Sequence, residues 1–266
     1  MGHEQSSLGS CKPKGKTDDI NNGSNNNKLQ GRKSLKRPLK LRISDEPYLA
    51  AIRNPVFLFP KGADQIEYLQ AFPIPIITNQ LYISNASGIC NIEKLKALGI
   101  TRVLNVGGLP AAFLPPEAYT EAGIEYKIVE EALDEPSYPM LNHHLEECID
   151  FIDKANEDGS QSRGKGKCVV HCFAGCNRSG VIVAAYYMLS TQTNVLETVL
   201  HCRNSRGSAF LTNPGFQRQL VALARREWLL GPAPGNKKCV VDRSLWRQSM
   251  ASSTRANERE MQKLGR

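Results

Sequence analysis

From residue 76 to residue 230, short apolar segments alternate with amphipathic ones, and this order restricts the folds that the chain can adopt. The apolar segments have the length of strands and lie at residues 80–84, 102–106, 125–129 and 168–171. Apolar residues recur at helical spacing in the segments 92–98 and 141–155. The apolar segment 179–190 is predicted to be a buried helix, and further helices are predicted at residues 194–203 and 214–229. Because strands separated by helices usually pair in parallel, the sequence predicts an α/β domain with a mostly parallel central sheet and helices on both faces.

The composition changes on both sides of this region, so we predict that the chain has four parts. Residues 1–45 are basic, rich in asparagine and poor in large apolar residues, so we expect a disordered tether. Residues 46–75 contain too many prolines for a long helix and are predicted to be a lead-in segment packed on the domain. Residues 76–230 form the folded domain. Residues 231–266 begin with Gly-Pro-Ala-Pro-Gly and are predicted to be a basic, flexible tail.

The positive charge of the chain is concentrated at its two ends. The formal net charge is +8, with ten Lys/Arg against three Asp/Glu in residues 1–44 and eight against three in residues 231–266. Residues 45–230 therefore carry a net charge of −4. A globular nucleic-acid binder carries its positive charge on the folded domain, so we expect no specific nucleic-acid partner and instead a contact between the tails and an anionic surface.

The cysteines and the apolar runs bear on the compartment. The eight cysteines occur without a secretory context, which is typical of reduced thiols, and no apolar stretch approaches the about 18 residues of a membrane-spanning helix. We therefore predict a cytoplasmic protein.

The strongest candidate site is the segment His-Cys-Phe-Ala-Gly-Cys-Asn-Arg-Ser-Gly at residues 171–180, between an apolar strand and an apolar helix. Backbone N–H groups of such a loop, together with the start of the following helix, can surround an oxyanion, so we call residues 172–178 the phosphate cradle. The same donors favour the thiolate of Cys172, which is the predicted nucleophile. Arg178 offers a planar fork for two phosphate oxygens, and Ser179 can donate a hydrogen bond to the sulfur.

The other cradle residues have lesser predicted roles. His171 is expected to brace the loop rather than to transfer a proton. The intervening residues are expected to bind substrate through the loop, and they are Phe173, Ala174, Gly175, Cys176 and Asn177. A metal site at Cys168, Cys172 and Cys176 is disfavoured because the spacing differs from that of zinc knuckles, so no metal is predicted.

A phosphate ester also needs a proton donor for its leaving oxygen, and the loop at residues 130–139, which we call the acid loop, offers carboxylates. It follows a predicted parallel strand, so it should emerge at the same sheet edge as the cradle. We choose Asp134 as the acid, with Glu130, Glu131 and Glu135 as competitors.

Two further pairs leave alternatives open. His143 and His144 are expected at the surface rather than as ligands. Arg203 and Arg206 are either a second anion site or solvated charges.

Together these motifs resemble the dual-specificity phosphatases of the cysteine-based protein tyrosine phosphatase superfamily. The likeness extends from about residue 77 to residue 226, with motifs at residues 81–83, 98–106, 171–180 and 213–220 and with the Asp134 loop in the expected order. The resemblance implies a three-layer α/β/α sandwich and no cofactor. It also implies a phosphocysteine on Cys172, acid and then base catalysis by Asp134, and phosphate binding by Arg178.

The resulting hypothesis is a phosphatase that hydrolyses phosphotyrosine, and also phosphoserine and phosphothreonine, in protein substrates. One alternative is the same chemistry on a phosphoinositide or an RNA 5′-phosphate, since Asn177 before the arginine also occurs in related RNA 5′-triphosphatases. The other alternative is a catalytically silent phosphate-binding module.

The first residues suggest a lipid anchor. Met-Gly-His-Glu-Gln-Ser at residues 1–6 fits the pattern for myristoylation of Gly2, and Cys11 is a candidate for palmitoylation. One acyl chain binds a membrane marginally, so the basic residues that follow would supply a second attraction. We therefore expect attachment to the cytoplasmic face of a membrane through the N-terminus.

Overall fold

The structure is a computed structural model, and it describes residues 39–40, 42–53, 72–157 and 166–234 of the 266-residue chain. The strands of this part are β1 (Ile74–Ile77), β2 (Leu81–Ser84), β3 (Ile100–Asn105), β4 (Glu125–Ile128) and β5 (Lys167–His171). The α-helices are α2 (Glu46–Arg53), α3 (Ile92–Leu98), α4 (Pro116–Glu121), α5 (Met140–Glu157), α6 (Arg178–Thr191), α7 (Val195–Arg206) and α8 (Pro214–Arg226), and two short 3-10 helices are η1 (Ile43–Asp45) and η4 (Leu109–Ala111).

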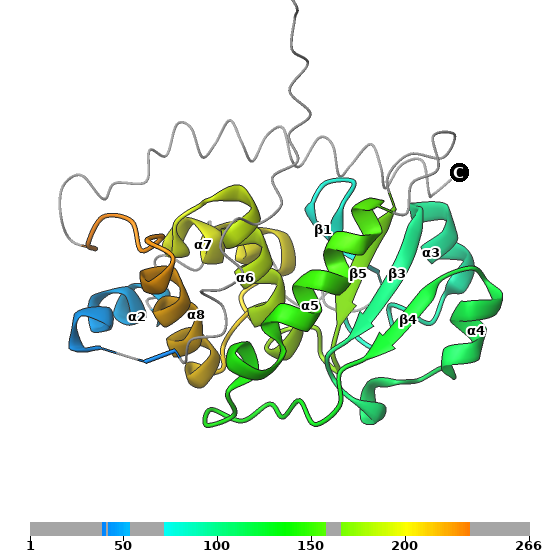
Figure 1. Ribbon diagram of the computed structural model, residues 1–266, viewed down its shortest axis with the longest axis horizontal. Coiled ribbons are helices and arrows are strands. Elements are labelled where there is room, and N and C mark those ends of the chain that lie inside the picture. Colours follow the sequence, from blue (N-terminus) through cyan, green and yellow to red (C-terminus); the bar gives the residue numbers. More distant parts are fainter. Residues whose placement is uncertain (1–38, 41, 54–71, 158–165, 235–266) are drawn as a thin grey trace, which may run out of the picture.

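The central sheet has five strands in the order β1-β2-β5-β3-β4. β2, β5, β3 and β4 are mutually parallel, whereas β1 is antiparallel to β2 (Figure 1). The predicted mostly parallel sheet is confirmed. The edge strand β1 was not predicted, because Pro75 lies inside it and proline is tolerated in a sheet mainly at an edge.

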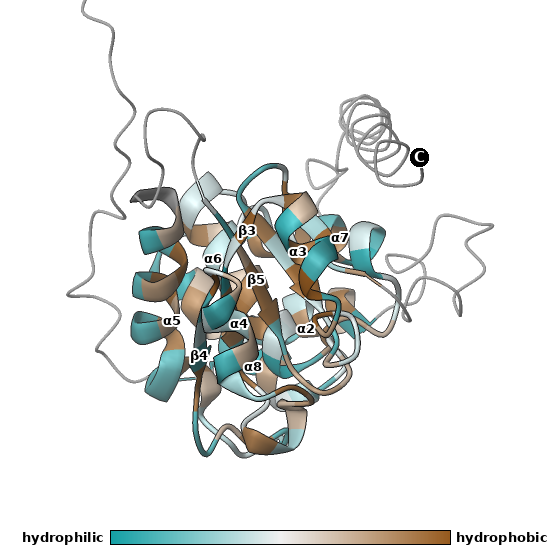
Figure 2. Cartoon of the chain, turned by 90° about the vertical axis from the view of Figure 1, so that its right-hand side faces the viewer, coloured by the Kyte–Doolittle hydropathy of each residue, from teal (hydrophilic) through white to brown (hydrophobic). Residues whose placement is uncertain are grey.

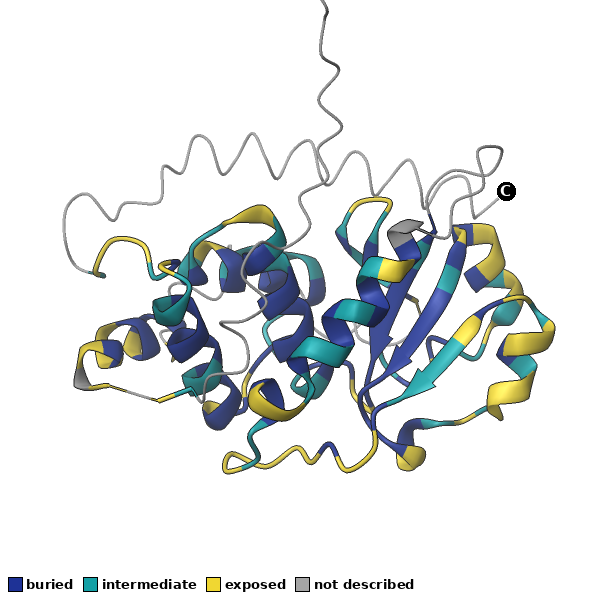
Figure 3. Ribbon diagram, viewed as in Figure 1, coloured by how far each residue is buried: buried dark blue, intermediate teal, exposed yellow. Residues whose placement is uncertain are grey.

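Helices cover both faces of the sheet, which gives the three layers of an α/β/α sandwich. One face of the strands, including Leu81, Leu104 and Val170, joins a large apolar core with α2, α5, α6, α7 and α8. The alternate residues Tyr82 and Val169 join a smaller core beneath α3 and α4. Figure 2 shows the apolar strands between the helices, and Figure 3 shows β3 and β5 as largely dark blue, buried ribbons. The alternation follows from the two-residue period of a strand.

Two short helices escaped the sequence analysis. α2 has eight residues, and its Pro47 stands in the first turn, where a missing N–H costs no helical hydrogen bond. α4 has six residues and also begins at a proline. The prolines concealed both helices, because a proline in a sequence usually marks a turn or the end of a helix.

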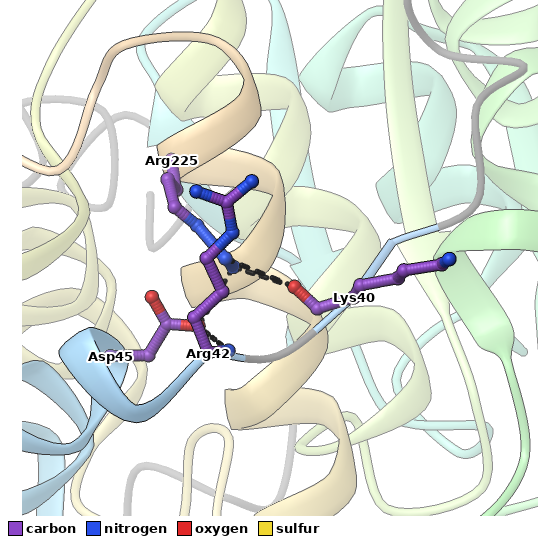
Figure 4. Close-up of polar contacts among 4 residues, drawn as sticks. All are labelled: Lys40, Arg42, Asp45 and Arg225. Carbon is purple, nitrogen blue, oxygen red and sulfur yellow. Dashed lines mark hydrogen bonds and ion pairs between the residues drawn. The ribbon is translucent and has the colours of Figure 1, made fainter.

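A polar cluster attaches the beginning of the described chain to α8 (Figure 4). The Arg225 guanidinium donates to the Lys40 carbonyl oxygen at 2.7 and 3.1 Å and to Oδ2 of the fully buried Asp45 at 2.7 Å. The same Oδ2 accepts from the Arg42 backbone N–H at 2.8 Å. The sequence does not reveal this contact, because Asp45 and Arg225 are 180 residues apart.

The ends of the chain largely lie outside the described residues. The structure does not describe residues 1–38 of the tether, residues 54–71 of the lead-in segment or residues 235–266 of the tail. At the tail's start, the Gly231 carbonyl oxygen accepts a 2.9 Å hydrogen bond from the Tyr48 hydroxyl. Within the described ranges, no helix is long and apolar enough to cross a membrane.

Candidate active site

The phosphate cradle connects the central strand β5 to the buried helix α6 at the carboxyl edge of the sheet. Cys172 follows the last residue of β5 and is 1% exposed. Its Sγ lies 3.2 Å from the backbone N of Gly175, which donates to it, and 3.3 Å from Oγ of Ser179. Two donors therefore meet the sulfur, and both can stabilise negative charge on it.

Four consecutive carbonyl groups of the cradle, from Phe173 to Cys176, accept hydrogen bonds from residues outside the loop. The carbonyl oxygen of Phe173 accepts from the Ala86 backbone, and that of Cys176 accepts from the Leu211 backbone. Between these two, the carbonyl oxygens of Ala174 and Gly175 accept from Arg206 at 3.1 and 3.0 Å. These contacts hold the carbonyl groups on the outer side of the loop, and the Gly175 N–H donates to the Cys172 sulfur. An anion site needs this arrangement, in which backbone N–H groups rather than carbonyl groups face the ligand.

Arg206 is the residue that sequence reasoning placed wrongly. Neither predicted alternative, a second anion site or a solvated charge, is correct, because Arg206 is 1% exposed and binds the back of the cradle. Arg203 is likewise buried, with its guanidinium on the carbonyl oxygens of Ile52, Phe210 and Leu211. Burial lowers the pKa of both, to about 10 for Arg203. Nothing in the local sequence distinguishes such arginines from surface ones.

Gly175 allows the close approach between the cradle and its support. Its φ is +69°, and a Cβ there would lie 2.5 Å from the Ser84 carbonyl oxygen and 2.7 Å from the Arg206 guanidinium. The position therefore requires glycine both for its conformation and for space.

Arg178, the first residue of α6, joins three loops of the sheet edge. Its Nη1 donates to the carbonyl oxygens of Gly107, after β3, at 3.0 Å and of Ala132, in the acid loop, at 3.1 Å. Its Nε is buried and has no hydrogen-bond partner among the described residues. This nitrogen remains available for an anion held in the cradle.

Asp134 lies beside the cradle. Its Oδ1 accepts from Nδ2 of Asn213 at 2.9 Å and its Oδ2 from Nδ2 of Asn177 at 3.4 Å. The Asn177 Oδ1 in turn accepts from the backbone N–H groups of Thr212 and Asn213, both at 2.9 Å. The exposed Asp134 carboxylate is thus oriented by a cradle residue and by the loop before α8.

The start of α8 also holds the rest of the acid loop, a role that the sequence did not reveal. A Cβ on Gly215 would lie 1.9 Å from the Pro136 carbonyl oxygen, so the loop backbone packs directly on the helix. Gln219 donates to the Tyr138 carbonyl oxygen at 2.7 Å and accepts from the Leu141 backbone at 2.9 Å.

The histidines have different surroundings. His171 is fully buried, and burial lowers its pKa to about 4, so its ring is neutral at pH 7. His143 is exposed, whereas His144 lies 2.5 Å from the Tyr138 hydroxyl and 2.9 Å from the Glu147 carboxylate. Those contacts give His144 a structural place beside the acid loop.

Two further cysteines near the motif have buried thiols. Cys168 belongs to the large core, and Sγ of Cys176 donates to the Ala174 carbonyl oxygen at 3.4 Å. Burial raises the pKa of both thiols. Among the described residues, no group of three or more His, Cys, Asp or Glu side chains is arranged to hold a metal ion.

The fold and this geometry agree with comparisons to known proteins. A family model for the dual specificity phosphatase catalytic domain matches residues 81–226. The chain belongs to the dual specificity phosphatase family. The matched range includes Cys172, Arg178 and Asp134, and the family resemblance inferred from the sequence is confirmed.

Individual relatives of this family match a part of the chain. Human dual specificity protein phosphatase 26 is 38% identical over 146 residues, which cover 55% of this chain and 64% of that protein. Dual specificity protein phosphatase 1 of Arabidopsis thaliana is 33% identical over 150 residues, which cover 56% of this chain and 68% of that protein. Among solved structures, the crystal structure of DUSP15 has 28% identity and a TM-score of 0.48, covering 59% of this chain and 92% of that one.

Proposed function

We propose that this member of the dual specificity phosphatase family is a cysteine-dependent protein phosphatase. The observation that carries the proposal is the convergence at one sheet edge of Cys172 with two donors on its sulfur, of the Arg178 guanidinium and of the oriented Asp134 carboxylate. A module that only binds phosphate needs neither a nucleophile nor an acid. The family match supports the same activity.

The proposed first step transfers the phosphoryl group to the enzyme. The Cys172 thiolate attacks phosphorus, a P–S bond forms, and the bond from phosphorus to the substrate oxygen breaks. Asp134 gives its proton to that oxygen, which leaves as an alcohol or a phenol. Arg178 and the inward N–H groups bind the equatorial phosphate oxygens, on which charge is spread in the transition state.

The second step regenerates the enzyme. Asp134, now ionised, accepts a proton from water while the water oxygen attacks phosphorus and the P–S bond breaks. The electron pair returns to Cys172, and Ser179 steadies the thiolate as it leaves. The neutral His171 takes no part in proton transfer and serves as a buried support beneath the cradle.

The alternative substrates have less support. Asn177 was the reason for considering an RNA 5′-phosphate as substrate. Its side-chain amide forms hydrogen bonds with Thr212, Asn213 and Asp134, so these contacts within the protein already engage it. The acid loop contributes four carboxylates beside the cradle, which disfavours a phosphoinositide carrying several phosphates.

The decisive experiment measures phosphate release from phosphotyrosine, phosphoserine and phosphothreonine peptides, a phosphoinositide and an RNA 5′-triphosphate. We expect turnover of the peptides and its loss by at least about 10³-fold in Cys172→Ser, which keeps the cradle for binding. Asp134→Asn should slow substrates with poor leaving groups much more than those with good ones. Turnover like wild type in Cys172→Ser would remove it as the nucleophile.

We also propose the domain arrangement and the lipid anchor predicted above. Residues 76–230 are the catalytic domain, and Gly2 and Cys11, which lie outside the described residues, are the candidate acyl sites. The support is the sequence frame at residues 1–6 and the basic composition of residues 1–44. Fractionation of cells that express wild type or Gly2→Ala tests the anchor: equal partition of both into the soluble fraction would contradict it.

A further inference from the structure

Large exposed apolar side chains gather around the phosphate cradle. Six lie in the described part of the chain. Trp228 follows α8, and Phe72 precedes the edge strand β1, where the Lys94 ammonium lies 2.8 Å from the centre of its ring. The other four belong to the three loops that surround Cys172, and we call them the apolar rim: Leu109, Phe113, Leu133 and Phe173, which are 73%, 51%, 49% and 54% exposed. Such grouping marks an interaction site, whereas scattered exposed apolar residues are ordinary.

Contacts place the rim at the mouth of the cradle. Phe173 is the residue after Cys172, and its ring meets that of Phe113 edge to face at 5.8 Å. Phe113 lies in the loop after β3, which packs on the cradle, since a Cβ on Gly107 would lie 3.0 Å from Cys172 Cα. The loop therefore borders one side of the site.

Arg178 brings the other two members of the rim to the same place. Leu109 lies two residues after Gly107 and Leu133 one residue after Ala132, and the carbonyl oxygens of Gly107 and Ala132 accept from one nitrogen of Arg178. The rim thus spans both loops that border the phosphate-binding arginine.

The charges beside the rim indicate what can cover it. Residues 106–116 contain no charged residue, and the acid loop contains four exposed carboxylates and no lysine or arginine. A second anionic group next to the phosphate would meet these carboxylates and find no cation in either loop.

We propose that the apolar rim selects phosphoprotein segments in which large apolar side chains flank the phosphorylated residue and acidic residues are absent. The proposal rests on the proposed phosphatase activity and adds its substrate class. Covering half-exposed Phe and Leu side chains removes apolar surface from water, which strengthens binding of the flanking residues. Phosphate and flanking residues would then be recognised by separate parts of the site.

The test compares three phosphopeptides with the same phosphorylated residue, flanked by Leu and Phe, by Ser and Asn, or by Asp. With the full chain we expect kcat/KM for the apolar peptide to exceed that for the Ser/Asn peptide by about tenfold, mainly through a lower KM, and the Asp peptide to rank last. Phe113→Ser and, separately, Leu133→Ser should reduce the ratio of the first two values severalfold. Trp228→Ser, equally a loss of an exposed apolar side chain but away from the cradle, should leave the ratio unchanged.

The outcomes separate this inference from the proposed function. Equal kcat/KM values for the three peptides, with turnover that depends on Cys172, would overturn the apolar rim and leave the phosphatase intact. A preference for the Asp peptide, or a higher rate on a phosphoinositide in vesicles, would also overturn it. A preference that persists in Phe113→Ser and Leu133→Ser variants with unchanged melting temperature would assign selection to other residues. Absence of turnover on every substrate would overturn both proposals.

Discussion

The phosphate cradle and the acid loop border the same site but are held in different ways. The cradle is surrounded by buried groups, and its carbonyls bind Arg206 and the backbones of Ala86 and Leu211. The acid loop is largely exposed and depends on side chains from α8 and its preceding loop, chiefly Asn213 and Gln219. The anion site is thus built into the core, whereas the carboxylate that serves it is attached from outside.

This difference predicts how the cradle and the acid loop each respond to amino-acid substitutions. A buried loop with fixed partners responds to a substitution with a loss of folding stability, because its surroundings cannot move. An exposed loop held by a few hydrogen bonds responds with a change in the position of its side chains. The predictions below use this contrast.

The largest effect is expected from Gly175→Ala. A left-handed backbone costs alanine about 1 kcal/mol, and the close Ser84 carbonyl and Arg206 guanidinium raise the loss of unfolding free energy to about 4 kcal/mol. Urea unfolding measures this loss, and phosphate release should fall with it.

Gly123→Ala is the matched control, because Gly123 has a φ of +73° and nothing within 4 Å of the added Cβ. It should lose only about 1 kcal/mol. Equal losses for the two variants would show that the cradle is not tightly packed against its support.

The next largest effect is expected from His171, which is buried beneath the cradle. Burial lowers the pKa of His171 to about 4, against 6.5 for a free histidine. Between these values the unfolded chain binds a proton and the folded protein does not. The free energy of unfolding should therefore fall as the pH drops from 6.5 towards 4, by about 3 kcal/mol in total.

Urea unfolding of wild type and His171→Asn across this range isolates the contribution, and the variant should lose that part of the pH dependence. An NMR titration of the folded protein in which the His171 ring protonates near pH 6.5 would contradict it.

The smallest effect is expected where the two regions meet. Asn177→Ala removes the cradle's hydrogen bond to Asp134, so turnover of substrates with poor leaving groups should fall about tenfold, and that of good ones less. In an Asp134→Asn background the substitution should add little, because the residue acts through that carboxylate.

Asn91→Ala serves as the control, since it removes a helix-capping side chain from α3. Its turnover should match wild type. A tenfold loss for Asn177→Ala that persists without Asp134 would show that Asn177 acts on the cradle itself.

Sequence patterns predicted the parts whose constraints are local. The predicted strands and helices correspond to β2–β5, α3 and α5–α8. A recurring apolar spacing indicated partly buried elements such as α5, and continuous apolar runs indicated the buried β5 and α6. The end of α3 at Gly99, with a φ of 73°, was also visible in the sequence, because glycine readily adopts the left-handed conformation that ends a helix. The edge strand β1 and the helices α2 and α4 were missed because each carries a proline in its first two residues, and a proline usually indicates a turn or a break.

The sequence by itself determined which family this protein belongs to and which residues are the candidates for its chemistry: a cysteine as the proposed nucleophile, an arginine six residues later as the proposed anion ligand, and a carboxylate after a neighbouring strand as the proposed acid. Only the tertiary structure decided what holds them, since Arg206 and Asn213 act on groups 31 and 79 residues away. The same holds for the apolar rim, whose members come from three separate loops. A residue type determines which reactions are available, whereas long-range contacts depend on how the whole chain packs, and no local pattern records them.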